Sequence, residues 1–145
     1  MVKWLSLFFI MGMMYFTLEG FFRGWANISM LFVGGTAAAL VGQLNQYPKY
    51  YSLKIWQQCL IGTGIVLVIE FISGMVLNAW LGLGIWDYSS QWGNIYGQIC
   101  PKFALIWFCL MPFNIWLDDW LRLKLYREGE HYSLTEIYQE LVTGK

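Results

Sequence analysis

Two carboxylates interrupt apolar segments of the chain, where ionised side chains are rare. Glu70 is the clearer case, because it stands between Ile69 and Phe71 and has no cation nearby in the sequence. Placing an ionised carboxylate at the middle of a bilayer costs several kcal/mol. Glu70 is therefore expected to face the interior of a helix bundle, either protonated or paired. It predicts a binding site for a proton, a cation or a polar solute, with a structural hydrogen bond as the alternative.

Glu19 is the other carboxylate, and Arg23 follows it by four residues. On a helix this spacing lets the two side chains pair along one face. A structural ion pair and a role in binding therefore both explain Glu19. Arg23 and Lys102, which we expect on the same side of the membrane, are also candidate partners of Glu70.

A glycine-rich, aromatic segment follows the Glu70 block, and residues 84–97 are its most distinctive part. Asp87, between Trp86 and Tyr88, supplies a carboxylate in apolar surroundings, and Asn94 adds an amide. Glycines permit the tight turns that a backbone needs in order to fold back at membrane depth, where it must be buried in protein. The segment predicts a pocket lid or re-entrant loop, with an aromatic belt at the membrane interface as the alternative.

Other kinds of chemistry find little support. Cys59, Cys100 and Cys109 have neither the spacing of metal ligands nor a disulfide pattern. The sequence contains no nucleophile–base pair and no phosphate-binding G-x-x-x-x-G-K-S/T motif. We therefore expect no catalytic residue, no metal and no cofactor, and we favour a non-enzymatic role. The zero net charge also argues against a nucleic-acid partner.

The composition assigns these residues to a membrane protein. Of 145 residues, 58% are hydrophobic and only 12% are charged. Soluble domains carry about 25% charged residues, because their surfaces must be hydrated. The apolar residues also form long blocks instead of narrow helical stripes. We therefore predict an all-α, polytopic protein embedded in a lipid bilayer.

Four apolar blocks approach the ~20 residues that a helix needs to cross the hydrocarbon core. A three-span alternative would omit the second block, whose small residues have another explanation. The predicted transmembrane domain covers residues 1–122, and a cytoplasmic tail covers residues 123–145. The expected spans are residues 4–22, 26–44, 55–77 and 103–121.

The distribution of basic residues sets the orientation, since cytoplasmic loops are enriched in Lys and Arg. Of the nine such residues, only Arg23 and Lys102 fall on the outer side if the N-terminus is cytoplasmic. We therefore expect both termini in the cytoplasm and the protein in the cytoplasmic membrane of a bacterium. The inner side then holds Lys3, Lys49, Lys54, Arg122, Lys124, Arg127 and Lys145.

Small residues recur every four positions in the second block, at Gly34, Ala38 and Gly42. This spacing lets two helix backbones approach closely in lipid. The expected contact is either with another helix of the same chain or with a second copy.

The tail contains a helix signal of its own. Ser133 and Glu136 have the spacing of a capping box. Leu134, Ile137, Tyr138 and Leu141 follow on one helical face. They predict a short amphipathic helix, which rests on the inner leaflet or the inner end of the bundle, or docks a partner.

The loop string Trp86-Asp87-Tyr88-Ser89, with Asn94 and Gly97 after it and Glu70 before it, is similar to that of a known family. Leu18-Glu19 and the glycine-rich second block add to the likeness, which covers residues 15–116. The chain resembles the ABC-transporter type IV (CmpB-like) family of small integral membrane proteins. The resemblance implies a polytopic membrane fold and a link to transport.

Three functions are consistent with these residues. The first is a transport or permease-like component, in which Glu70 and Glu19 bind a proton, cation or polar substrate beneath the outer loop. So small a chain would form a homo-oligomer or join a partner membrane subunit, and any ATPase would be a separate subunit, because the phosphate-binding loop is missing. The alternatives are a non-catalytic pore former (holin-like) or accessory subunit, and an intramembrane lipid-modifying enzyme with Glu70 and Asp87 as general acid and base.

Overall fold

The computed structural model describes residues 2–44 and 46–144, and over these ranges the chain is all-helical, as predicted. Met1, Asn45 and Lys145, the last of which is among the predicted cytoplasmic cations, lie outside the described residues. The helices are α1 (Val2–Arg23), α2 (Ile28–Leu44), α3 (Pro48–Tyr51), α4 (Ile55–Gly74), the π-helical η1 (Met75–Trp80), α5 (Pro101–Tyr126) and α6 (Leu134–Thr143).

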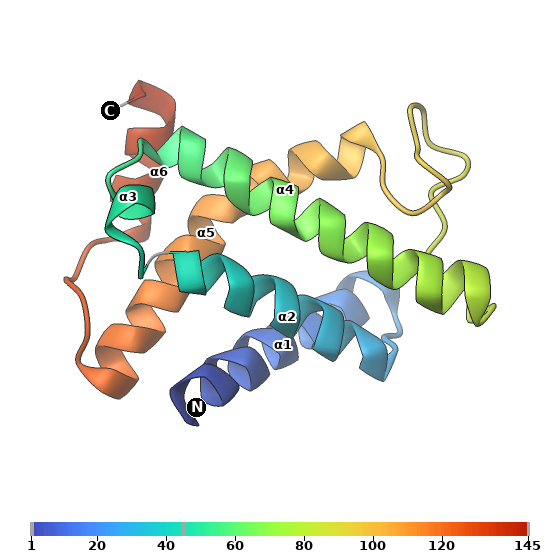
Figure 1. Cartoon of the computed structure of the whole chain (residues 1–145), viewed down its shortest axis with the longest axis horizontal. Coiled ribbons are helices and arrows are strands. Elements are labelled where there is room, and N and C mark those ends of the chain that lie inside the picture. The colour runs from blue at the N-terminus through green and yellow to red at the C-terminus, as the bar shows by residue number, and fades with distance from the viewer. Residues whose placement is uncertain (1, 45, 145) are drawn as a thin grey trace.

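Helices α1 and α2 form an antiparallel pair that packs closely because glycines meet at the contact (Figure 1). A methyl group at Gly12 of α1 would lie 3.2 Å from the Cα of Gly35 and 2.5 Å from the backbone oxygen of Leu31. Since real Cβ atoms do not approach a carbonyl that closely, the pair requires glycine at position 12. This contact is within the chain, and it is made by Gly35, the neighbour of the predicted Gly34.

The main core lies where four helices converge. Val41 of α2, Cys59 of α4, Met111 of α5 and Ile137 of α6 are each buried there. A second cluster joins the first half of α1 to α2 and to the end of α5, through Leu7, Met11, Ala38, Leu117 and Leu121. The helices therefore form one bundle, in which α2 and α5 contribute residues to both clusters.

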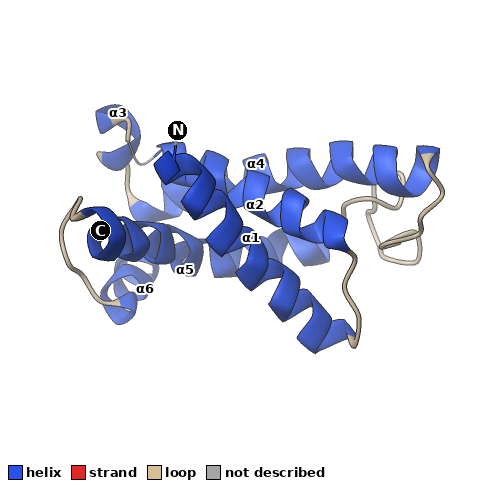
Figure 2. Ribbon diagram, turned by 90° about the horizontal axis from the view of Figure 1, so that it is seen from below, coloured by secondary structure: helices blue, strands red, loops and turns tan. Residues whose placement is uncertain are grey.

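The two ends of the bundle differ in character. Both views show α3 and α6 at one end of α4 and the long loop after η1 at the other end (Figures 1 and 2). The N- and C-terminal ends of the chain lie toward the α3–α6 end. We call residues 81–100 the outer loop and the end that carries it the outer end.

Helix α5 changes direction midway, as its ribbon shows (Figure 1). Pro112 lies inside the helix and removes a backbone donor from it. Helix α6 packs on both α4 and α5. It begins with the predicted capping box, since Glu136 N donates to Ser133 Oγ at 3.2 Å and Ser133 N donates to Glu136 Oε2 at 2.6 Å.

Two helical segments are long and apolar enough to cross a membrane, Val2–Arg23 and Ile55–Trp80. Helix α2 is apolar but has only 17 residues. The second half of α5 carries Asp118, Asp119 and Arg122, and these charges lower its mean hydropathy. The segments that were predicted as first and third spans thus meet the length and composition of a membrane helix.

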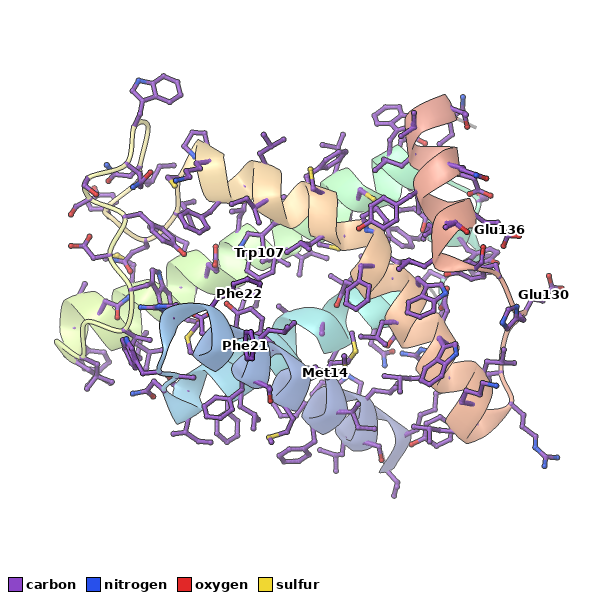
Figure 3. All side chains as sticks on the ribbon, turned by 180° about the vertical axis from the view of Figure 1, so that it is seen from behind. Met14, Phe21, Phe22, Trp107, Glu130 and Glu136 are labelled. Carbon is purple, nitrogen blue, oxygen red and sulfur yellow. The ribbon has the colours of Figure 1, made fainter. Side chains whose placement is uncertain are left out.

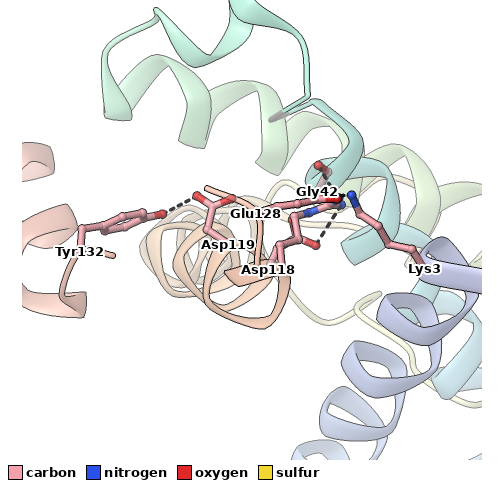
Figure 4. Close-up of polar contacts among 7 residues, drawn as sticks. Lys3, Gly42, Asp118, Asp119, Glu128 and Tyr132 are labelled. Carbon is pink, nitrogen blue, oxygen red and sulfur yellow. Dashed lines mark hydrogen bonds and ion pairs between the residues drawn. The ribbon is translucent and has the colours of Figure 1, made fainter. Parts of the chain in front are cut away.

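Two charged residues of α5, Asp118 and Arg122, form an ion pair inside the bundle. Arg122 Nε donates to Asp118 Oδ2 at 2.5 Å, and the exposed fractions of the two side chains are 4% and 1%. Arg122 Nη2 also approaches the backbone oxygen of Gly42 at 3.3 Å. A methyl group at Gly42 would lie 2.6 Å from Asp118 Cγ, and Figure 4 shows the carboxylate against this glycine. This salt bridge within α5 is therefore buried and packs against Gly42 of α2.

Candidate functional site beneath the outer loop

Glu70 lies on the face of α4 that is turned into the bundle, and its exposed fraction is 6%. Its Oε2 atom is buried and has no hydrogen-bonding partner among the described residues. The indole N–H of Trp107, on α5, faces this carboxyl. The two groups do not complete a hydrogen bond, because Trp107 Nε1 is itself buried and unpartnered. An acceptor and a donor are thus both left unsatisfied in the interior, which is uncommon in native structures.

Thr63 extends this polar line toward the other end of α4. It is 7% exposed, and its Oγ1 atom is also buried without a partner. Thr63 stands seven residues before Glu70, which places both on one face of the helix. Three unsatisfied polar atoms on two packed helices can accept a ligand that both donates and accepts hydrogen bonds, or an ion with its water.

Glu19 and Arg23 form the predicted pair at the outer end of α1. Arg23 Nη1 donates to Glu19 Oε1 at 2.5 Å, and Arg23 Nη2 donates to the backbone oxygen of Ile85 at 2.6 Å. The arginine therefore ties α1 to the outer loop and is not the partner of Glu70. Lys102, the other candidate, lies with its Nζ atom 5.9 Å from the ring centroid of Phe103.

Tyr15 connects these two groups of side chains. Its ring centroid lies 5.7 Å from that of Trp107, and its hydroxyl contacts Glu19. Gly34 makes room for this ring, since a methyl group there would lie 2.6 Å from Tyr15 Cγ. The Glu19 carboxylate also repels a negative charge on Glu70 across the site. When both carboxylates are ionised, Arg23 neutralises Glu19, and no described residue forms an ion pair with Glu70.

The outer loop packs against the helices at the outer end of the bundle, next to this site. Ile85 is 1% exposed and Trp86 is 5% exposed, and both pack on Met30 of α2. Trp86 Nε1 donates to the backbone oxygen of Gln98 at 3.1 Å. Asn78, in the π-helical turn, accepts from Ile85 N at 2.7 Å through Oδ1. The loop is thus fastened to both α1 and the end of the Glu70 helix.

Tyr88 of the loop reaches the same electrostatic neighbourhood. Its ring stacks on Phe103 of α5 with centroids 4.4 Å apart. Burial raises the pKa of Tyr88 well above its ordinary value, and the nearby Glu70 and Glu19 carboxylates raise it further. The hydroxyl therefore stays protonated and can donate a hydrogen bond.

Asp87 and Asn94 are used by the loop itself. Asp87 is exposed, and its Oδ1 accepts from Ser89 N at 2.8 Å. The N–H and hydroxyl of Ser89 hold the pKa of the Asp87 carboxyl below its usual range. Asn94 Nδ2 donates to the backbone oxygens of Ser89 at 3.0 Å and Gln91 at 2.8 Å, and Asn94 Oδ1 accepts from Gly97 N at 3.0 Å. The structure therefore brings Glu19, Arg23, Glu70, Trp86 and Tyr88 together, while Asp87 and Asn94 stabilise turns.

Three contributors were not singled out from the sequence, namely Tyr15, Trp107 and Gln98. Gln98 is 6% exposed, and its Oε1 accepts from Asn78 Nδ2 at 3.0 Å. The room for it comes from Gly74, where a methyl group would lie 2.9 Å from Gln98 Cδ. Trp107 and Tyr15 stand in apolar blocks among many other aromatic residues, and no spacing distinguishes them.

The fold and the site define an all-helical bundle with apolar helices of membrane-spanning length and a buried carboxylate under a fastened loop. The chain belongs to the family described as "Putative ABC-transporter type IV", whose model matches residues 3–128. This confirms the resemblance found in the sequence, and the description indicates an ABC-transporter-related membrane protein. No curated protein and no solved structure matches the chain.

Proposed function

We propose that this chain is the membrane-embedded component of a transport system and that Glu70 binds a transported or coupling cation beneath the outer loop. The observation that carries the proposal is the buried, unpartnered Oε2 atom of Glu70. A carboxylate in such a place is stable only if it is protonated or bound to a cation. Arg23 is bonded to Glu19 and to the backbone oxygen of Ile85. No described basic side chain therefore pairs with Glu70.

A proton or a monovalent cation fits the site best. The site carries one uncompensated negative charge when both carboxylates are ionised. The neighbouring groups with lone pairs or N–H donors, from Thr63, Trp107 and Tyr88, can orient a small ion together with one or more water molecules. Exchange of that ion for a proton would neutralise the Glu70 carboxylate. In many pumps and transporters, such a change at an intramembrane carboxylate couples ion movement to a conformational change.

The proposed topology has four transmembrane helices, α1, α2, α4 with η1, and α5, with both termini in the cytoplasm. Support comes from the position of both ends of the chain at the end opposite the outer loop (Figures 1 and 2). Helix α5 is compatible with a membrane because Asp118 and Arg122 neutralise each other inside the bundle. The tail, with α6, then lies at the cytoplasmic side of a bacterial cytoplasmic membrane.

The proposed transport system contains more than this chain. The family description refers to ABC transporters, whose transport is driven by ATP hydrolysis, and the sequence has no phosphate-binding loop. The ATPase would therefore be a separate subunit. Several copies of this chain, or a partner membrane subunit, would complete the pathway.

Ion flux in liposomes tests the proposal. We expect the wild-type chain to dissipate an imposed proton, Na⁺ or K⁺ gradient faster than empty liposomes do, and Glu70→Gln to be folded but inactive. Glu130→Gln is the matched control, because Glu130 is exposed in the tail, away from the bundle (Figure 3). Equal flux in the wild type and Glu70→Gln contradicts the proposal. Release of a large trapped dye by every variant identifies a pore former instead.

A further inference from the structure

The bend of α5 is contacted by a side chain of α6. The hydroxyl of Tyr138 donates to the backbone oxygen of Cys109 at 2.8 Å. The backbone N–H of Phe113 faces the same hydroxyl oxygen. Pro112 has no N–H, and its ring crowds the preceding turn, so a helix loses regular hydrogen bonds around this position. Tyr138 therefore bonds a backbone acceptor before the bend and lies near a backbone N–H after it.

Helix α6 is docked independently of this hydroxyl. Ile137 is 4% exposed and packs in the main core with Cys59, Met111 and Ile115. Its neighbour Tyr138 is thus carried to the bend by a helix that is already in place. Burial raises the pKa of Tyr138, so the hydroxyl keeps the proton that it donates.

We infer that α6 is a latch on the bend of α5, closed by the Tyr138 hydroxyl, and that opening the latch changes the direction of one half of α5 relative to the other. The half before the bend carries Trp107, five residues before Pro112 and about 7.5 Å away along a helix. The half after the bend packs on α1 and α2. A change in the bend therefore moves Trp107 relative to Glu70. Only this last step depends on the function proposed for Glu70.

Backbone amide exchange of the full chain in lipid nanodiscs tests the latch. Tyr138→Phe keeps the ring and removes the hydroxyl that bonds the Cys109 carbonyl. We expect the Phe113 amide, which lies beside this bond, to exchange about three- to tenfold faster, because the bend loses the free energy of one hydrogen bond. Tyr132→Phe is the matched control, since its hydroxyl donates to Asp119 Oδ2 at 2.6 Å, beyond the bend. This variant should leave the Phe113 amide unchanged. Equal exchange in the wild type and Tyr138→Phe overturns the inference.

A second background separates the latch from a general loosening of the tail. Pro112→Ala restores the N–H that pairs with the Phe108 carbonyl and removes the ring that crowds the preceding turn, so α5 can form its regular hydrogen bonds there, including the one from Phe113 N to Cys109 O. Adding Tyr138→Phe to Pro112→Ala should then have little further effect on the Phe113 amide. If Tyr138→Phe accelerates exchange of the Phe113 amide equally in the wild-type chain and in Pro112→Ala, Tyr138 does not act through the bend, and the latch is rejected.

The bend itself can be measured as a distance. Leu105 and Leu125 are exposed and lie on opposite halves of α5. Spin labels attached at these positions in a chain without other cysteines should give a shifted or broader distance distribution in Tyr138→Phe, and an unchanged one in Tyr132→Phe. A distance distribution in Tyr138→Phe that is the same as in the wild type contradicts the inference. None of these measurements requires transport, so they fail or succeed independently of the proposed function.

Discussion

Replacing Asp118 by asparagine is predicted to destabilise the bundle more than any comparable change of a surface carboxylate. Asp118 is 1% exposed, and Arg122 beside it is 4% exposed. The carboxylate receives two contacts from the guanidinium, at 2.5 Å from Nε and 3.4 Å from Nη2. Asp118→Asn leaves a buried guanidinium without its counter-charge, and breaking a buried pair in this way costs about 3–5 kcal/mol.

The loss is measurable as a change in the free energy of unfolding, by titration of the purified chain with a denaturing detergent in mixed micelles. Asp119→Asn is the control at the adjacent position, because Asp119 is only half-buried and its hydrogen bond from Tyr132 can be kept by the amide oxygen. We expect about 1 kcal/mol or less for this control.

A paired replacement separates the charge effect from simple loss of contact. Asp118→Leu combined with Arg122→Met removes both charges and keeps apolar volume, so it should recover most of the stability lost in Asp118→Asn. If Asp118→Asn costs less than about 1 kcal/mol, the pair is not desolvated in the folded protein. The proposed burial of charge inside α5 would then be wrong.

Three further outcomes are expected. Arg23→Gln frees the backbone oxygen of Ile85 and should accelerate amide exchange of the outer loop by about tenfold, since it removes a charge-assisted bond; unchanged exchange would contradict the role given to Arg23. Gly34→Ala places a methyl group against Tyr15 and should cost about 1–3 kcal/mol in unfolding measurements. The Asp87 carboxyl has a lowered pKa, so its contribution is complete above about pH 3.9, the ordinary value, and is lost as the pH falls through its folded pKa. Protection of the outer-loop amides from exchange should therefore be constant from about pH 8 to 5 and fall below about pH 4. The same fall in Asp87→Asn would contradict the role given to Asp87.

The parts of the fold that depend on neighbours in sequence could be predicted. The Glu19–Arg23 pair follows from a spacing of four residues on one helix, and the start of α6 follows from Ser133 and Glu136. The all-helical class follows from the length of the apolar blocks. The interior position of Glu70 follows from the cost of exposing a carboxylate to lipid.

Long-range contacts account for what could not be predicted. Arg23 donates to Ile85, which is 62 residues away, and the sequence contains no pattern that pairs them. Trp107 meets Glu70 only because α4 and α5 pack together at that level. These contacts depend on the relative rotation of the helices, which local spacing does not determine.

The loop string shows a different limit. Asp87 and Asn94 resemble ligand-binding residues because both are polar groups in an aromatic segment. In the structure their oxygens and nitrogens bond the backbone of the same loop. Asp and Asn have this dual character because their short side chains can close turns as readily as they can bind ligands. Residue type alone therefore cannot separate a folding role from a binding role.

The central claim is that Glu70 is a cation-responsive carboxyl held away from bulk water inside the bundle. Infrared difference spectroscopy of the chain in nanodiscs measures this directly, by following the band of a protonated carboxyl while Na⁺ or K⁺ is added or the pH is raised. We expect one such band to disappear in the wild type and in Glu130→Gln, and to be missing from the start in Glu70→Gln. A difference spectrum that is the same with and without the Glu70 carboxyl would contradict the claim.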